Sequence, residues 1–134
     1  MRREQKILKE AHTVAVVGAS PDISRHSNAV TAYLMAAGFR VIPVNPNVDT
    51  VLGQKTYPDL ASIPEKVDIV NVFRASEYTP GVAEEAVAIG ARVLWLQQGI
   101  VNDEAADIAM QGGLEVIMDR CIARAHAAMN GVAH

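Results

Sequence analysis

The sequence predicts an α/β domain built on a doubly wound parallel sheet. Five short runs rich in valine and isoleucine alternate with segments of helix-forming residues, which is the pattern of successive βαβ units. These runs are apolar throughout, which is typical of strands buried on both faces. The chain has 134 residues, of which 50% are hydrophobic, so we expect one domain over residues 1–134 with a packed core.

The first half of the chain is expected to hold two helices and two strands. An amphipathic segment opens it, and a β-branched run that ends at a glycine follows as the first strand. The second helix carries an apolar stripe and ends at Gly38, as glycine commonly does at a helix C-terminus. Pro43 weakens the second strand because a proline has no N–H to donate to a ladder. These elements are expected at residues 4–11, 13–17, 29–37 and 40–44.

The second half continues the alternation after a long irregular connection, residues 46–66, with one helical turn near residues 59–62. Thr79 is the expected N-cap of the third helix, with Pro80 in the first turn. Glycines close the third and fourth helices. Strands are expected at residues 67–72, 92–96 and 114–118, and helices at residues 80–89 and 103–110.

Right-handed crossovers between these strands give a Rossmann-like sheet, for which we expect the strand order 3-2-1-4-5. The ordered core is expected over residues 10–126, and the tail after Arg124 carries no core signal and is expected to be frayed. In such sheets ligands bind beyond the carboxyl ends of the strands, where the strand order reverses. The residues that directly follow each strand are therefore the candidate site.

Composition and charge exclude several classes of function. Twelve Lys and Arg against fifteen Asp and Glu give a net charge of −3, which argues against a main role in binding nucleic acid or an anionic membrane. No run reaches the roughly 18 apolar residues of a membrane span. Cys121 is the single cysteine, and the polar N-terminus has no secretory signal. We therefore expect a cytoplasmic protein.

The turn Gly18-Ala19-Ser20 follows the first strand and leads toward a helix. Glycine lets the backbone approach a phosphate, and a helix N-terminus offers free N–H groups to an anion. A plain tight turn is the alternative. The turn is not the full dinucleotide fingerprint, because Ser20 stands at the place of the second glycine.

The end of the second strand argues against NAD. NAD-binding folds usually place a carboxylate there, on the ribose hydroxyls, whereas this chain has Asn45 followed by Pro46. A nucleotide that carries more phosphate near its ribose becomes plausible, and simple turn chemistry is the alternative. The basic residues that can bind such phosphates are Arg25, His26, Arg40, Lys55 and Arg74. For each of them, a solvated surface charge is the alternative interpretation.

No catalytic constellation is found, so we expect a protein that is not an enzyme. The four histidines show no metal-ligand spacing, and they are His12, His26, His126 and His134. Cys121 lies five residues from His126, in a tail of uncertain structure, and a buried thiol is the simpler interpretation.

An ordered set of motifs resembles the stand-alone CoA-binding domain proteins, the YccU-like group, over residues 10–126. It is also similar to the CoA-binding domain of the succinyl-CoA ligase α subunit and of ADP-forming acyl-CoA synthetases. Members of the group often have proline and tyrosine where this chain has His26 and Asn28. The motifs that carry the resemblance are Val-Val-Gly-Ala-Ser (16–20), Val-Ile-Pro-Val-Asn-Pro (41–46), Leu-Gly-Gln-Lys-Thr-Tyr (52–57), Val-Asp-Ile-Val-Asn-Val-Phe-Arg (67–74), Leu-Trp-Leu-Gln-Gln-Gly-Ile (94–100) and Val-Ile-Met-Asp-Arg-Cys-Ile (116–122).

The resemblance implies that CoA is the ligand and implies a role for each matching position. The pyrophosphate would lie on Gly18, Ala19 and Ser20. The adenosine and its phosphorylated ribose would lie beside Asn45 and Pro46. The implied positions that flank the nucleotide are Phe73 and Arg74, and those that meet the pantetheine arm are Gln97, Gln98 and Gly99.

The sequence therefore predicts a CoA or acyl-CoA binding module that serves as a carrier, sensor or regulatory partner. One alternative is a small NAD(P)-binding enzyme or sensor domain. Another is a docking subunit that completes a split acyl-CoA synthetase by binding a partner chain. Docking, or a homodimer, would need an exposed apolar patch, for which the N-terminal helix and residues 95–100 are the candidates.

Overall fold

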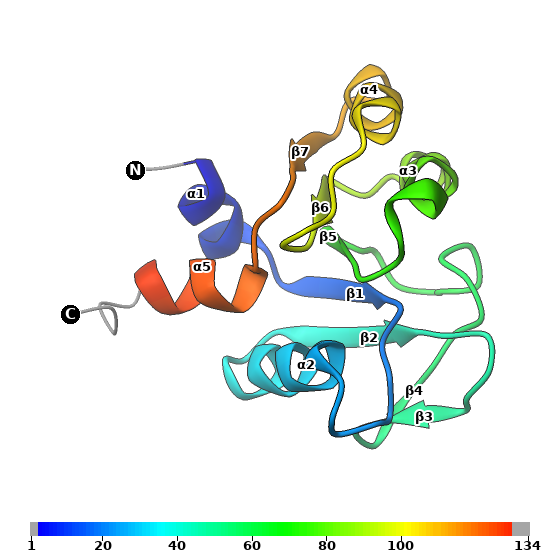
Figure 1. Ribbon diagram of the computed structural model, residues 1–134, viewed down its shortest axis with the longest axis vertical. Coiled ribbons are helices and arrows are strands. Elements are labelled where there is room, and N and C mark those ends of the chain that lie inside the picture. Colours follow the sequence, from blue (N-terminus) through cyan, green and yellow to red (C-terminus); the bar gives the residue numbers. More distant parts are fainter. Residues whose placement is uncertain (1–2, 130–134) are drawn as a thin grey trace.

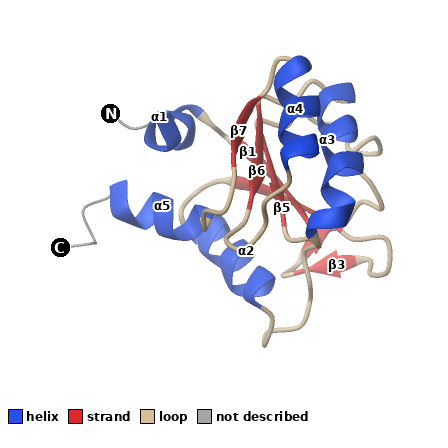
Figure 2. Ribbon diagram, turned by 45° about the horizontal axis from the view of Figure 1, so that its top comes forward, coloured by secondary structure: helices blue, strands red, loops and turns tan. Residues whose placement is uncertain are grey.

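The computed structural model describes residues 3–129 and shows one parallel sheet between two layers of helices (Figures 1 and 2). All neighbouring strands of this sheet run parallel. The doubly wound α/β fold is therefore confirmed. The sheet has the order β2-β1-β5-β6-β7, and its strands are β1 (Thr13–Val17), β2 (Arg40–Val44), β5 (Ile69–Val72), β6 (Val93–Leu96) and β7 (Glu115–Ile117).

Each face of the sheet is covered by its own group of helices (Figure 2). One face packs against α1 (Arg3–Glu10), α2 (His26–Ala36) and α5 (Ile122–Met129). The other face packs against α3 (Thr79–Ala88) and α4 (Asp103–Gln111). Successive strand residues point to opposite faces of the sheet. Val16 packs in the core beneath α1, α2 and α5, and Val17 packs in the core beneath α3 and α4. None of the helices described is long and apolar enough to cross a bilayer.

The strand order differs from the expected one. Counted along the main sheet, the order is 2-1-3-4-5 rather than 3-2-1-4-5, because β5 pairs with β1 and leaves β2 at the edge. The Pro43 carbonyl accepts a hydrogen bond from the Tyr57 N–H at 3.1 Å on the outer side of β2. The N–H that proline lacks is therefore missing from the edge, where a proline is tolerated. Pro43 was the sequence signal for an edge strand.

The connection between β2 and β5 is more regular than expected. It contains a hairpin of β3 (Thr50–Val51) and β4 (Gln54–Lys55), whose turn places Leu52 and Gly53 at φ 51° and 76°. Positive φ at both central residues is the geometry of the tight hairpin turns that match strand twist. The expected helical turn near residues 59–62 is instead a turn in which Asp59 Oδ1 accepts the Ser62 N–H at 2.9 Å.

Helix boundaries also depart from expectation at three places. Helix α2 begins at His26, three residues before the expected start. A short 3-10 helix (η1, Ser76–Tyr78) precedes α3, and Thr79 lies inside α3 with its hydroxyl donated to the Ser76 carbonyl, so Thr79 is not the cap. The prediction of a frayed tail is wrong for residues 125–129, which belong to α5. Residues 130–134 lie outside the described residues.

Helix α5 is held by contacts that its own sequence does not reveal. Ala125 is only 1% exposed, and Nδ1 of His126 lies 2.9 Å from the Tyr33 hydroxyl of α2. The His126 ring also meets the Phe39 ring edge to face, with centroids 5.4 Å apart. Tertiary packing against distant residues therefore orders a segment whose local pattern carries little core signal.

Candidate functional site

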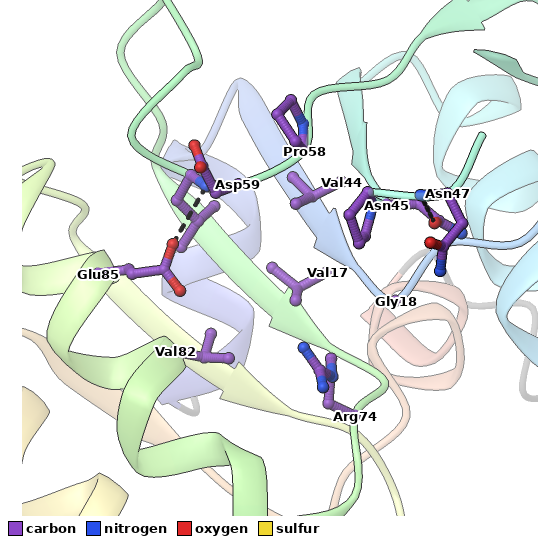
Figure 3. A pocket seen from close by; sticks show the side chains of 12 residues that line it. Val17, Gly18, Val44, Asn45, Asn47, Pro58, Asp59, Arg74, Val82 and Glu85 are labelled. Carbon is purple, nitrogen blue, oxygen red and sulfur yellow. Dashed lines mark hydrogen bonds between the residues drawn. The ribbon is translucent and has the colours of Figure 1, made fainter. Parts of the chain in front are cut away.

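Three cavities meet at Asn45, beyond the carboxyl ends of β1 and β2. Their volumes are about 310, 450 and 350 Å³. The strand order reverses between β1 and β5, so these cavities lie beside the switch point at which such sheets bind ligands. We name them the apolar cavity, after the valine, leucine and proline side chains that share its wall with polar ones, the hairpin cavity and the amide cavity. The apolar cavity (Figure 3) is lined by Val17, Gly18, Val44, Asn45, Pro46, Asn47, Pro58, Asp59, Leu60, Arg74, Val82 and Glu85.

The other two cavities lie to either side of the β2 tip. The hairpin cavity is lined by Asn45, Pro46, Val48, Asp49, Lys55, Thr56 and Pro58. The amide cavity is lined by Gly18, Ala19, Ser20, Arg25, His26, Ser27, Asn45 and Phe73.

Gly18 lets the first turn pass close to the end of β5. Its φ is +88°, and a Cβ at this position would lie 3.2 Å from the Phe73 Cβ and 3.3 Å from the Phe73 carbonyl. Both the backbone conformation and the lack of space favour glycine here. The Gly18 N–H donates to the Val44 carbonyl at 3.1 Å, so this amide belongs to the sheet and is not available to a ligand.

Free backbone donors line the amide cavity. Among residues 3–129, the N–H groups of Ala19 and Ser20 and the first two of α2, at His26 and Ser27, have no hydrogen-bond partner. Arg25 is the N-cap residue of α2, and its side chain makes no capping hydrogen bond. Unpaired amides at the start of an 11-residue helix carry a partial positive charge, which suits a phosphate or another anion.

Asn45 fixes the orientation of the first turn. Its Nδ2 donates to the Ala19 carbonyl at 2.8 Å, and its Oδ1 accepts the Asn47 N–H at 2.8 Å. The carbonyl and the following N–H of a trans peptide point in opposite directions. The Ser20 N–H is therefore turned away from Asn45. Asn28 Nδ2 donates to the next carbonyl, that of Ser20, at 2.9 Å. Asn28, which stands where the resembling proteins often have tyrosine, therefore supports the same turn.

The basic residues predicted near the site are placed in different ways. Arg25 and Arg74 are exposed and line the amide and apolar cavities, and neither belongs to an ion pair within the described part of the chain. The Arg74 guanidinium lies 4.5 Å from the centroid of the Tyr78 ring, a distance typical of cation–π contact. Arg40 is engaged elsewhere, since its Nη2 lies 2.6 Å from Glu65 Oε2. This hydrogen bond raises the pKa of Arg40 above its ordinary value.

Part of the apolar cavity was not predicted from sequence. Val82 and Glu85 lie in its wall opposite Asn45 (Figure 3), and Glu85 Oε1 accepts the N–H of Leu60, which also lines the cavity, at 3.4 Å. These residues follow no strand, so the rule that selected residues after strand ends passes over them. Only the packing of α3 against the loop after Tyr57 brings them to the site.

The residues expected to meet a pantetheine arm line none of these three cavities. Gln97 is 2% exposed, and its Oε1 accepts the Ile122 N–H at 3.0 Å. The Gly99 N–H donates to Asp119 Oδ1 at 2.7 Å, whereas Gln98 is exposed. The structure therefore gives Gln97 and Gly99 roles within the fold, and contact of these residues with a ligand stays a prediction.

One thiol–imidazole contact lies beside the amide cavity. Cys121 Sγ is 3.9 Å from His26 Nε2, and the His26 ring meets Phe73 edge to face at 6.1 Å between centroids. Cys121 is 3% exposed, as the sequence interpretation of a buried thiol expected. Over residues 3–129, no group of three or more His, Cys, Asp or Glu side chains has the arrangement of a metal site.

Comparisons with known proteins show what this chain is similar to. Residues 12–127 match a family described as CoA binding domain. The chain is 47% identical over 123 residues to the uncharacterized protein YneT of Bacillus subtilis, covering 92% of this chain and 91% of that one. It is 33% identical over 82 residues to the ADP-forming acetate–CoA ligase II of Archaeoglobus fulgidus, covering 60% of this chain and 12% of the ligase. A hypothetical protein from Pyrococcus horikoshii has a similar structure, with a TM-score of 0.93 and 38% identity over 96% of this chain and 90% of that one.

Proposed function

Since the chain belongs to the family of CoA binding domains, we propose that it binds CoA or an acyl-CoA in the crevice around Asn45. The observation that carries this proposal is the set of unpaired amides at Ala19, Ser20, His26 and Ser27. Four unpaired N–H groups on residues that line one cavity, two of them in the first turn of a helix, suit the diphosphate of such a ligand. Arg25 adds a charge at the same cavity.

The adenosine of the ligand would lie on the other side of Asn45. The apolar cavity has Pro46, Leu60 and Val82 in its wall, side chains that suit the face of a purine ring. Arg74 lines this cavity (Figure 3), and its chain neighbour Phe73 lines the amide cavity. The pantetheine arm would leave past Phe73 toward Gln98.

Asn45 disfavours the alternative ligand NAD. Both polar atoms of its amide are already bonded to backbone, at Ala19 and Asn47, and the side chain carries no carboxylate for a pair of ribose hydroxyls. An uncharged strand tip also avoids repelling a phosphorylated ribose. CoA has such a phosphate and NAD does not.

We further propose that the chain works as a carrier, sensor or regulatory partner in the cytoplasm and has no catalytic machinery of its own. The crevice presents amides, apolar surface and arginines. Of its other ionisable groups, Asp59 and Glu85 accept hydrogen bonds from backbone N–H groups, and His26 lies against the buried Cys121 thiol. A docking role beside a separate synthetase chain is the second candidate, which the match to part of the acetate–CoA ligase favours.

The docking surfaces expected from sequence are not apolar patches in the structure. Ile7 and Leu8 of α1 are each 3% exposed, and Trp95 of β6 is fully buried. A partner chain would have to use other residues. A direct binding assay with a synthetase chain that lacks its own CoA-binding domain therefore tests the docking role.

A thermal-shift series tests the proposed function. CoA, acetyl-CoA, NAD, NADP and ATP are compared at equal concentration. A ligand at about 100 times its dissociation constant stabilises the fold by about 2.7 kcal/mol, which is visible in the unfolding midpoint. We expect a shift with CoA and acetyl-CoA. A shift with NAD and none with CoA contradicts the proposal.

A further inference from the structure

We propose that Lys55 binds the 3′-phosphate of CoA, so that this chain distinguishes CoA from dephospho-CoA. The inference rests on the proposed CoA function and adds a specificity residue to it. It assigns the hairpin cavity, which neither the diphosphate nor the adenine ring would occupy.

The arrangement of the three cavities matches the substitution pattern of the CoA ribose. That sugar carries a base at C1′, a phosphate at C3′ and the diphosphate at C5′. Around Asn45, the apolar cavity suits the base and the amide cavity suits the diphosphate. The hairpin cavity shares Asn45, Pro46 and Pro58 with the apolar cavity, so a third substituent of the same sugar would enter it. Dephospho-CoA has no such substituent.

Lys55 is positioned by the hairpin that the β2 edge holds in place. Residue Tyr57 bridges to Val44 in parallel register, and its carbonyl accepts the Asn45 N–H at 3.0 Å. Lys55 Nζ lies 5.1 Å from the centroid of the Tyr57 ring. The cation–π contact and the hairpin backbone hold the ammonium group near the tip of β2 without neutralising it.

The charges around this cavity single out Lys55 as the cation for a phosphate. It is the one Lys or Arg among the seven lining residues, and it belongs to none of the ion pairs found within residues 3–129. The nearby Arg40 is held by Glu65 and by Gln54. Asp49 is the one carboxylate that lines the same cavity, and it opposes an anion there.

The test measures the dissociation constants of CoA and dephospho-CoA by calorimetry for the wild type and for Lys55→Met, which keeps the apolar stem. We expect the variant to lose about fivefold to tenfold in CoA affinity, as for one exposed charge-assisted contact, and to bind dephospho-CoA within about twofold of wild type. Lys9→Met removes the same charge from α1, which lies far from the β3–β4 hairpin (Figure 1). This control should change neither constant.

Asp49→Asn supplies the opposite change at the same cavity. It should raise the affinity for CoA about twofold to fivefold and leave dephospho-CoA unchanged. Equal losses for the two ligands in Lys55→Met, or no loss for either, overturn the inference while CoA binding itself stands. Failure of the wild type to bind CoA overturns the proposed function, and the inference with it.

Discussion

The Asn45 side chain donates a hydrogen bond to the Ala19 carbonyl at 2.8 Å and so ties the tip of β2 to the turn after β1. Its Oδ1 is occupied by the Asn47 N–H, which fixes which end of the amide faces Ala19. The strand tip therefore acts as a donor toward the turn. The Ser20 N–H, which follows the Ala19 carbonyl, is left free for an anion.

Replacing Asn45 by Asp should weaken CoA binding by about tenfold or more. The carboxylate loses the donor to Ala19 and adds a negative charge where three cavities meet. Calorimetry with CoA measures the loss. Asn102→Asp, at the N-cap of α4, introduces the same charge outside the three cavities and should leave CoA binding unchanged. An unchanged affinity of Asn45→Asp for CoA would show that Asn45 does not contribute to the binding site.

Replacing Gly18 by Ala should destabilise the fold by about 1–3 kcal/mol, because the residue has φ +88° and a Cβ would approach Phe73 to 3.2 Å. Denaturant unfolding measures the change. Gly81→Ala is the matched control, because Gly81 lies in α3 and a Cβ there meets nothing within 4 Å. Alanine should stabilise that helix by a few tenths of a kcal/mol to about 1 kcal/mol. Equal effects at the two glycines would refute the close approach.

Replacing Arg74 by Ala should reduce CoA affinity by about fivefold to tenfold, because the apolar cavity loses an exposed guanidinium that belongs to no described ion pair. The dissociation constant is measured at low and at high salt. The loss should be smaller at high salt, since an exposed charge is screened. Arg124→Ala, on the exposed side of α5, is the control. Identical constants in the two variants would make Arg74 an ordinary surface charge.

Stability should fall in acid through Asp68. Burial raises the pKa of this carboxyl. The hydrogen bonds that it accepts from the N–H groups of Thr13 and His12, together with the positive charge of Arg92, nevertheless hold its pKa below the ordinary 3.8. The unfolded chain therefore takes up the proton first. The contribution of Asp68 is complete above about pH 5 and is lost as the pH falls through the folded value.

Unfolding of Asp68→Asn across this range checks the assignment. The variant should be less stable than the wild type at neutral pH, by about 1 kcal/mol. The difference should shrink as the pH drops below the ordinary value of 3.8. A difference that does not depend on pH would mean that the charge of Asp68 contributes nothing.

Much of the sheet could be predicted from local sequence because buried parallel strands leave continuous apolar runs. All five strands were expected within two residues of their observed ends, and Thr13–Val17 and Arg40–Val44 match in full. The order of the strands depends on a long-range choice at the end of β2. Pro43 indicated that β2 is an edge strand, since a proline favours an edge. The strand order became clear only from the pairing of β5 with β1.

The site divides in the same way. Gly18 and Asn45 follow strand ends, so topology alone placed them together. Leu60 and Val82 come from segments whose contribution depends on tertiary packing. Lys55 was among the basic residues expected from the sequence, but only the packing of the hairpin against β2 gives it a place at the site. No spacing rule connects a loop leucine to a helix valine more than 20 residues later.

An amide-resolved NMR titration with CoA tests the central claim most directly, because it reports on the N–H groups themselves. We predict that the largest shifts on binding fall on Ala19, Ser20, His26 and Ser27, whose N–H groups have no hydrogen-bond partner in the part of the chain that the structure describes. The Gly18 amide, bonded to Val44, should shift less. Saturable CoA binding that leaves those four amides unmoved, or no binding at all, would contradict the account.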